Sequence, residues 1–436
     1  MLAVLVPSSV SAHAHLERSD PSADARLAAA PTVIRLWFSE APELALSGVA
    51  LLDSAGSSSA LGPLEQGADG PRSVRVAIPR ALPPGVYKVK WHVVAADGHP
   101  SSGTFAFRVL PPAVPAVIES REPPAPPPMI GDTVGAAAET GADALAPADV
   151  VVRALLFITM LAVLGAVAFR FIVLPRAGRL EPGVRDGLAS SIAARGAVAS
   201  ALLVVLLLAT LMLQARLVAS TSTALTGMER IAIDSRWGAA WATQLAGSVL
   251  ALIGFALARR TRAGWPFAAL GAGAIAIGAS LGGHAGASDH LYALGVLADA
   301  LHVVGAAGWL GALLWLVLSL PVVSTHEKGV ATIVNAFSPM ALAFAALVAL
   351  TGLVNAWLRL GSIPALWSSS YGQVLLVKLA LLAGVALVGL YNWRRMRPAI
   401  DRGVVTPRFV RSATVELAFA VAVILVTAVL VATPTP

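Results

Sequence analysis

The chain contains no cysteine, which excludes disulfide bonds, thiolate metal sites, iron–sulfur clusters and thiol catalysis together. Charged residues are also scarce, since Asp, Glu, Lys and Arg make up only 13% of the 436 residues, about half their usual share in soluble proteins. Hydrophobic residues reach 57%, and several runs are long enough to cross a hydrocarbon core of about 30 Å. The sequence therefore predicts a polytopic membrane protein and excludes a simple cytosolic enzyme.

Motifs for nucleotide-dependent chemistry are missing as well. We find no Walker loop, dinucleotide-binding fingerprint or catalytic-triad pattern, so ATP-driven pumping within this chain is not expected. The net charge is +7, but the surplus lies in residues 149–436, which hold 21 basic and 10 acidic residues. Basic residues confined to membrane loops indicate topology and give no reason to expect nucleic-acid binding.

The first twelve residues are typical of the end of a secretory signal, although a positively charged start is missing. The alternative is an uncleaved, unstructured terminus. Cleavage after Ala12 would create a free α-amine on His13, whereas cleavage after Ala14 would leave His15 first.

Residues 13–110 alternate apolar and polar side chains, the period of half-buried strands. The residues that share a face are Ile34, Leu36 and Phe38; Val74, Val76 and Ile78; Tyr87, Val89, Trp91 and Val93; and Phe105, Phe107 and Val109. Turn signals such as Asp53–Gly56 and Pro83–Gly85 separate these runs. We therefore predict one all-β domain, an immunoglobulin-like antiparallel sandwich of the cupredoxin-like Greek-key type. Residues 111–148 contain nine prolines and are expected to form an extended tether.

Residues 149–436 are predicted to form an all-α membrane domain. Its eight hydrophobic spans lie near 150–172, 189–213, 237–257, 265–283, 291–318, 333–357, 372–392 and 410–432. With the sandwich outside, the inner loops hold 15 Lys and Arg residues and the outer loops hold four. This asymmetry predicts that both termini lie outside the cytoplasm.

Histidine is the most informative residue type. Of the eight histidines, His13, His15, His92 and His99 lie in the sandwich, His284, His290 and His302 lie at or near the outer ends of spans four and five, and His326 falls in a predicted cytoplasmic loop. Seven of eight are thus on the outer side or just beneath it, which indicates metal handling.

In the sandwich, a free amine and imidazole on His13 would form a chelate. Asp97 and His99 stand two residues apart and project to the same side of extended backbone, and Pro100 restricts His99 to such backbone. Three nitrogens and one oxygen suit a tetragonal Cu(II) site. The alternative is a hairpin turn that leaves His99 exposed. An amine followed by His15 at the third position is a second possible chelate, and His92 is expected to be a solvated surface residue.

In the membrane domain, Asp299 and His302 lie three residues apart on one helix face, so they can meet a common partner. Ionisable residues inside spans are costly and mark functional sites by default. With His284 and the loop residue His290 nearby, we predict a metal entry site at the outer leaflet. The alternative is that Asp299 and His302 satisfy each other across helices and the other two are solvated. Weaker candidates are Met340, whose thioether could bind Cu(I) but is more often packing, and Glu416, which is expected to pair with Lys378 or mark a proton or ion path.

Longer motifs carry a family resemblance. His13-Ala14-His15-Leu16, Ile34 through Glu40, and Trp91 through Pro100 with its Asp97-Gly98-His99 resemble the periplasmic copper-binding CopC family. The spans that follow are similar to the CopD family, on looser motifs such as Gly283-His284-Ala285 and Trp309-x-Gly311. The resemblance implies a CopC–CopD fusion in a bacterial cytoplasmic membrane.

The same resemblance implies Cu(II) ligation by His13, Asp97 and His99, with Glu40 as a neighbouring support. It also implies Cu(I) or Cu(II) in the membrane domain, copper uptake or resistance as the function, and extracytoplasmic copper chaperones as further partners. Some CopC proteins carry a methionine-rich Cu(I) site, but 13–110 contains no methionine, so this domain is predicted to bind Cu(II) only.

Three other functions compete with copper transport. A membrane cupric reductase would need a haem between facing helices, for which His284 and His302 could supply axial ligands. A copper-dependent polysaccharide oxygenase would need an exposed aromatic platform, which residues 13–110 lack. A copper buffer or sensor would bind the ion without any flux.

Overall fold

The computed structural model describes residues 15–95, 100–111, 147–218, 228–229, 231–233, 235–282, 292–326, 328–401 and 407–433. These residues form two compact units, an all-β unit within His13–Ala142 and an all-helical unit within Asp143–Pro436. The predicted signal end at 1–12 and nearly all of the predicted tether lie outside the described residues.

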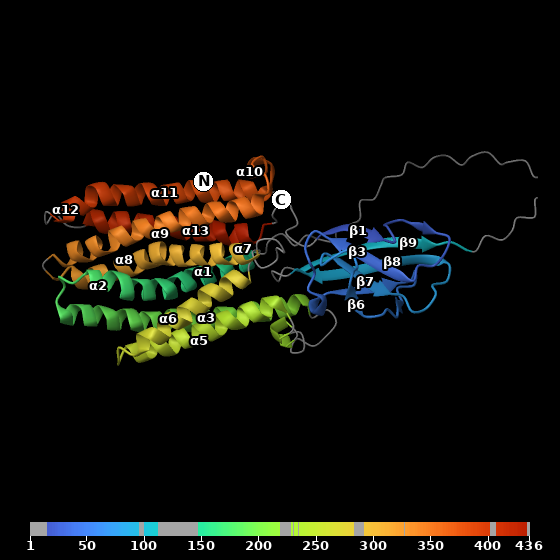
Figure 1. Cartoon of the computed structure of the whole chain (residues 1–436), viewed down its shortest axis with the longest axis horizontal. Helices are drawn as coiled ribbons and strands as arrows, with labels where there is room; N and C mark the ends of the chain where they lie inside the picture. The colour runs from blue at the N-terminus through green and yellow to red at the C-terminus, as the bar shows by residue number, and fades with distance from the viewer. Residues whose placement is uncertain are drawn as a thin grey trace, which may run out of the picture. The chain divides into compact units, whose positions relative to one another are not determined.

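The all-β unit is a sandwich of two sheets (Figure 1). The first sheet has the order β1-β3-β7-β6 and the second β2-β9-β8-β4-β5. The strands are β1 (Leu16–Asp20), β2 (Arg26–Leu27), β3 (Val33–Phe38), β4 (Gly48–Leu52), β5 (Ser58–Ser59), β6 (Leu64–Gln66), β7 (Ser73–Ala77), β8 (Gly85–Val94) and β9 (Pro100–Val109). The predicted antiparallel sandwich is confirmed, with β2 and β9 as one short parallel pair.

The sandwich core consists of the alternating residues identified from the sequence. Ile34, Leu36 and Phe38 of β3 are almost completely buried, as are Val89 and Val93 of β8. Phe38 also contacts Trp91 across the two sheets, edge to face, with ring centroids 5.3 Å apart. Because successive side chains of a strand point to opposite faces, this pattern fixes the register of both central strands.

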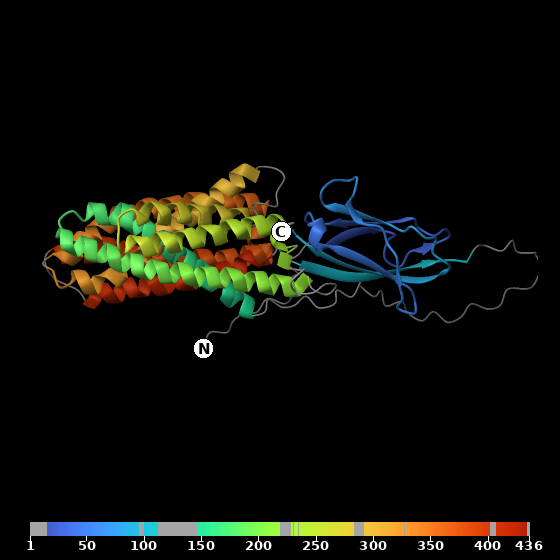
Figure 2. The same ribbon diagram turned by 90° about the horizontal axis from the view of Figure 1, so that it is seen from below.

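The helical unit contains, within its described residues, eight segments that are long and apolar enough to cross a membrane (Figures 1 and 2). They are Asp149–Arg176, Pro182–Gln214, Arg236–Ala258, Gly264–Leu281, Ala293–Val323, Gly329–Leu360, Ser370–Ile400 and Arg408–Val431. The eight predicted spans are therefore confirmed. Several helices are longer than the predicted apolar runs, because they include polar residues at their ends.

The helices that make up these segments are α1 (Pro147–Ala168), α2 (Leu174–Arg176), α3 (Pro182–Val218), α5 (Arg236–Ala258), α6 (Gly264–Leu281), α7 (Tyr292–Ala306), α8 (Ala312–Val323), α9 (Gly329–Leu360), α11 (Ser370–Tyr391), α12 (Arg397–Asp401) and α13 (Pro407–Val431), with the short α10 (Ala365–Ser368) between α9 and α11. Three π-helical turns interrupt them: η2 (Phe169–Val173), η4 (Ala307–Gly311) and η5 (Asn392–Met396). Such turns are rare and are frequent at functional sites.

Small residues bring α5 and α6 close together. A Cβ built on Gly254 would lie 2.3 Å from the backbone nitrogen of Ala268, and one on Gly271 would lie 2.5 Å from that of Ala251. Only glycine fits at these positions, which is the packing expected of helices in a membrane. The glycine-rich sequence around span four is thus explained by helix contact.

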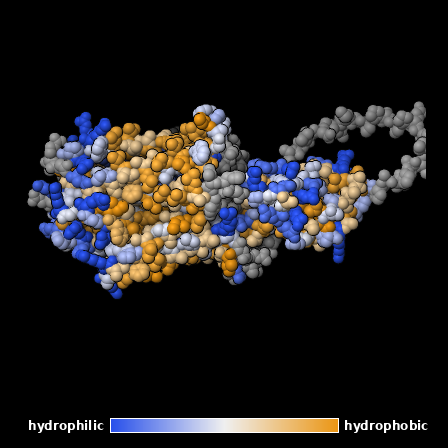
Figure 3. Space-filling view, in the orientation of Figure 1, coloured by the Kyte–Doolittle hydropathy of each residue, from blue (hydrophilic) through white to orange (hydrophobic). Residues whose placement is uncertain are grey.

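The surface of the helical unit matches a bilayer. An apolar belt covers the middle of the visible face, and hydrophilic residues gather at the end where α2 and α12 lie (Figure 3). The basic residues around this end include Arg176, Arg179, Arg394 and Arg395. The chain is therefore a multi-pass membrane protein whose basic loops collect at one end of its helices.

Candidate metal-binding regions

The segment 39–42 holds two described parts of the chain together at one end of the sandwich. The backbone N–H of His15 donates to Ser39 Oγ at 3.1 Å, and the N–H of Ser39 donates to the His15 carbonyl at 3.0 Å. Three residues later Pro42 pairs with Ala95, the last described residue before segment 96–99. The short segment 39–42 thus contacts both His15, the residue that follows His13–Ala14, and Ala95, which lies two residues before Asp97.

The predicted Cu(II) ligands His13, Asp97 and His99 lie outside the described residues. Their described neighbours are nevertheless close, because β8 and β9 pair up to Val94 and Pro100, and His15 lies only two residues after His13. The fold therefore brings His15, Ala95 and Pro100, the described residues nearest in sequence to the three predicted ligands, to one end of the sandwich.

Glu40 lies within this connecting segment and is half-buried. Its position beside Ser39 and Pro42 puts it between the two strand ends that flank the predicted ligands. His15 is exposed and is held through its backbone. Neither residue contributes to a described cluster of potential metal ligands.

His92 corrects one expectation. The sequence predicted a solvated residue, but His92 is half-buried and pairs with Gly48 of β4. A Cβ built on Gly48 would lie 2.5 Å from the His92 ring, so the missing side chain creates the space that the imidazole fills. Burial, and then the charge of Lys90, lower the pKa of His92. This histidine is a packed residue of the second sheet.

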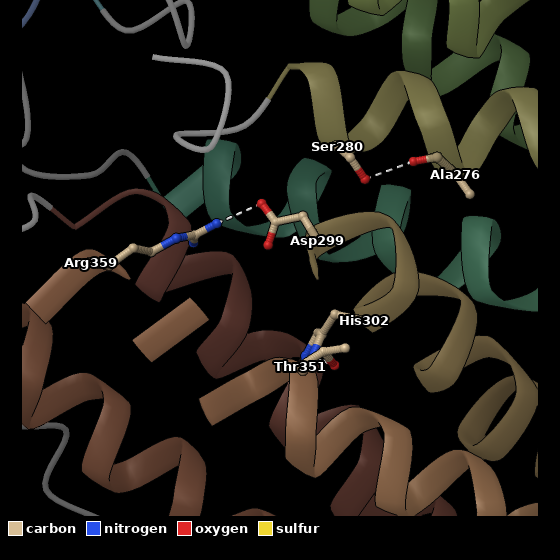
Figure 4. Close-up of polar contacts among 6 residues, drawn as sticks. All are labelled: Ala276, Ser280, Asp299, His302, Thr351 and Arg359. Carbon is tan, nitrogen blue, oxygen red and sulfur yellow. Dashed lines mark hydrogen bonds and ion pairs between the residues drawn. The ribbon is translucent and has the colours of Figure 1, made fainter. Parts of the chain in front are cut away.

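In the helical unit, Asp299 of α7 forms an ion pair with Arg359 in the last turn of α9 (Figure 4). The Oδ2 and Nη2 atoms lie 2.7 Å apart, and the two side chains are 17% and 19% exposed. Lys378 of α11 lies within electrostatic range of both. Sequence reasoning missed this pairing, because Arg359 was assigned to an outer loop.

His302, one turn after Asp299 on α7, also contacts α9. Its Nδ1 lies 3.0 Å from Thr351 Oγ1 (Figure 4), and Thr351 donates its hydroxyl proton to the Leu347 carbonyl at 2.7 Å. With that proton directed to Leu347, Thr351 Oγ1 can accept a hydrogen bond from His302 in the tautomer that carries its proton on Nδ1. The neutral imidazole then carries its free lone pair on Nε2, the atom that can bind a metal ion.

The prediction that Asp299 and His302 share one face is confirmed, and α9 is their common partner. The alternative in which they satisfy each other is wrong, because each bonds to its own residue of α9. Thr351, Asn355 and Arg359 recur every four residues in the sequence, and this spacing places them along one helix face. That polar stripe was a signal that could have identified the partners of α7.

The remaining described candidates, Met340 and Glu416, have other partners. His284 and His290 lie outside the described residues, and Met340 is 6% exposed within the apolar core. Glu416 accepts a hydrogen bond from Asn392 at 2.9 Å, so its expected pairing with Lys378 is wrong. In the part of the chain that the structure describes, no three His, Asp or Glu side chains gather closely enough to hold a metal ion.

Three segments of the chain match known protein families. Residues 16–110 match the family described as CopC domain. Residues 144–294 match "Copper resistance protein D-like, N-terminal domain", and residues 331–430 match "Copper resistance protein D". These ranges agree with the sandwich and with the first and last parts of the helical unit.

The chain has relatives that match its whole length and relatives that match a quarter of it. The chain is 27% identical to the copper transport protein CutJ of Bacillus subtilis over 99% of its own length and 76% of the relative. It is 38% identical to protein YobA of Escherichia coli K12 over 24% of its own length and 85% of that protein. The crystal structure of CopC from Methylosinus trichosporium OB3b covers 23% of this chain and 95% of its own, with 35% identity and a TM-score of 0.21. A CopC domain is followed here by both CopD segments, and the chain therefore belongs to the family of CopC–CopD fusion proteins.

Proposed function

We propose that this chain binds Cu(II) with its sandwich and passes copper across the cytoplasmic membrane through its helical unit. The observation that carries this proposal is the joining of a CopC domain to both CopD segments in one chain. A relative that matches along 99% of the chain is named a copper transport protein. The family resemblance further suggests uptake as the direction.

The sandwich supplies the capture site in this proposal. His13 binds Cu(II) through its amine and imidazole, and Asp97 and His99 complete a tetragonal set of ligands. The contacts of segment 39–42 with His15 and Ala95 support it, since they bring the flanking residues to one end. Glu40 lies in that segment and supports the ligands without binding the ion. Extracytoplasmic copper chaperones are the proposed donors of the ion.

His302 supplies the first ligand of the membrane path. In the tautomer that donates Nδ1–H to Thr351, Nε2 is unprotonated, which is the form a metal ion requires. His284 and His290 are the proposed further ligands at the outer end. Asp299 has a different role, because its ion pair with Arg359 occupies the carboxylate.

The proposed topology places both termini outside the cytoplasm. It rests on the basic residues around α2 and α12, which would face the cytoplasm under the positive-inside rule. The sandwich would then meet copper on the outer side, and His302 would lie in the outer half of its span.

Copper flux into proteoliposomes tests the membrane part of the proposal. Full-length protein should carry copper, and His302→Ala should abolish the flux. His326→Ala is the matched control, because His326 is exposed after α8 and should transport normally. Equal flux in the His302→Ala variant would contradict the proposed path, and zero flux with intact Cu(II) binding would favour a buffer or sensor.

Cu(II) affinity tests the sandwich part. Protein that begins at His13 should bind Cu(II) tightly, and one extra residue ahead of His13 should weaken binding strongly because it removes the free amine. His92→Ala should change the affinity little, since His92 packs against Gly48. The coordination is read by electron paramagnetic resonance of the full-length protein, and equal effects of the two changes would overturn the ligand assignment.

A further inference from the structure

The helical unit buries a second carboxylate, and its surroundings differ from those of Asp299. Glu416 of α13 is 5% exposed, and its Oε2 accepts one hydrogen bond, from Asn392 Nδ2 at 2.9 Å. A Cβ built on Gly389 would lie 3.2 Å from Oε1. The carboxyl group thus lies beside Gly389 of α11, whose missing side chain leaves room for it, and is hydrogen bonded to Asn392 of η5.

No described cation compensates this carboxylate. α13 packs against α11, α1, α8 and η5. The ionisable residues of these elements and of α13 itself are Tyr371, Lys378 and Tyr391 in α11, Arg394 and Arg395 in η5, Asp149 and Arg153 in α1, and Arg408 and Arg411 in α13; α8 has none. Arg394 and Arg395 are exposed, and Lys378 lies near Asp299 and Arg359. Within the described residues, Glu416 forms no ion pair with any of them.

Asn392 has an unused hydrogen-bond acceptor within the described residues. Its Oδ1 is buried and receives no hydrogen bond in the described part of the chain. An ionised carboxylate has no hydrogen to offer, whereas a protonated one carries an O–H donor. A proton on Glu416 would therefore let the two groups form an acid–amide pair, with O–H donating to Oδ1 and Nδ2–H donating to the carboxyl oxygen. An ionised carboxylate in apolar surroundings carries a large free-energy cost, which a single amide does not offset. Protonation of Glu416 removes this cost as well.

From this juxtaposition we infer that Glu416 is a proton-binding site, protonated in the resting protein and deprotonated when a cation enters the helical unit. The coupling rests on the proposed copper transport. In the coupled step the carboxyl O–H bond breaks, the electron pair stays on Glu416, and the proton passes to water at the end where α2 and α12 lie. The entering cation supplies the positive charge that the carboxylate then needs, and the attraction between the two is strong in a low-dielectric interior.

The position of Glu416 suits this role. It lies nine residues after the first residue of α13, about 14 Å along the helix from that end. Its partner Asn392 begins η5, a π-helical turn that continues α11. α11 also carries Lys378 within electrostatic range of the Asp299–Arg359 pair, so this helix places a charge near one buried carboxylate and continues into the hydrogen-bond partner of the other.

Infrared difference spectroscopy of the full-length protein in lipid vesicles tests the proton site without copper. The wild-type spectrum should contain a carbonyl stretching band of a protonated carboxyl group that disappears as the pH is raised. Glu416→Gln should lack the band, and Asp299→Asn should retain it, because Asp299 is paired with Arg359 and stays ionised. A wild-type spectrum without the band, or a band that survives in Glu416→Gln, would overturn the assignment. The wild-type titration decides the matter even if the variant fails to fold.

Adding Cu(II) to the same vesicles tests the coupling. The band should weaken as a pH-sensitive dye records proton release, and Glu416→Gln should release fewer protons. A band that is unchanged while copper crosses the membrane would overturn the coupling. Absence of flux together with an intact, pH-sensitive band would overturn the proposed transport function and leave the proton site standing.

Discussion

Each of the two units contains an arginine–aspartate ion pair, and the two pairs differ in their surroundings. In the sandwich, Arg35 and Asp20 lie 2.9 Å apart with side chains 50% and 58% exposed. In the helical unit, Arg359 and Asp299 lie 2.7 Å apart with side chains 19% and 17% exposed. Water screens the first pair, so it contributes little stability. Water has little access to the second pair, so removing one of its charges would leave the other buried and uncompensated.

This contrast explains where each unit keeps its polar groups. The sandwich can carry charges on strand faces without compensation and needs only an apolar interior. In the described part of the helical unit, few charged side chains lie in the interior, and Asp299 and Arg359 are paired across neighbouring helices. Charged residues in the helices are therefore better guides to function than those in the sandwich.

The largest expected effect comes from breaking the buried pair. Arg359→Met leaves Asp299 without its guanidinium and should destabilise the helical unit by about 3 kcal/mol, toward the lower end for a buried pair because Lys378 still lies near Asp299. Calorimetry of the full-length protein in detergent measures the loss. Arg35→Met is the matched control and should cost at most about 1 kcal/mol. Similar losses in the two variants would show that burial does not change how much an ion pair contributes to stability.

The next effect concerns the two packed histidines. Thr351→Val removes the side-chain acceptor of His302 Nδ1–H and should cost about 1–2 kcal/mol. Thr351→Ser keeps a hydroxyl and should restore most of the stability and the copper flux. A Thr351→Val variant with unchanged stability and flux would contradict the role of Thr351 in fixing the imidazole.

His92 provides the corresponding test in the sandwich. Burial holds the pKa of His92 in the folded domain below its ordinary value of about 6.5. As the pH falls through that value, the unfolded chain takes up a proton that the folded domain does not, so stability decreases toward acid, by at most about 1.4 kcal/mol per pH unit. His92→Gln should flatten the stability of the sandwich between pH 7 and pH 5. The same slope in both proteins would contradict this assignment.

The smallest effect distinguishes the two buried carboxylates. Glu416→Gln preserves the shape and the hydrogen bond from Asn392 and should change stability by less than about 0.5 kcal/mol. Asp299→Asn leaves Arg359 buried without its partner and should cost clearly more. A stability loss for Glu416→Gln as large as that for Asp299→Asn would mean that Glu416 is ionised in the resting protein.

The sequence was sufficient for the architecture because both units have strong periodic signals. The alternation around Ile34 and Trp91 specified the sandwich core, and the long apolar runs specified all eight spans. The partners of buried polar residues were harder to predict. The spacing of Asp299 and His302 shows that they share a face, but it does not show which helix covers that face. Arg359 was misplaced because its charge favoured a loop, while its ion pair keeps it within the last turn of α9.

The histidine at 92 shows a second limit. Alternation placed His92 opposite Trp91, which is correct. Its half-burial depends on Gly48 in a different strand, forty-four residues earlier, and no pattern within β8 contains that information.

The most direct test of the account links capture to transport in one measurement. Copper flux into proteoliposomes is recorded at limiting and at saturating Cu(II) for protein that begins at His13, for the same protein with one residue added ahead of His13, and for His302→Ala. We predict that the added residue lowers flux at limiting copper but not at saturating copper, whereas His302→Ala lowers it at both. Flux at limiting copper that is unaffected by the added residue would contradict delivery from the sandwich to the helices.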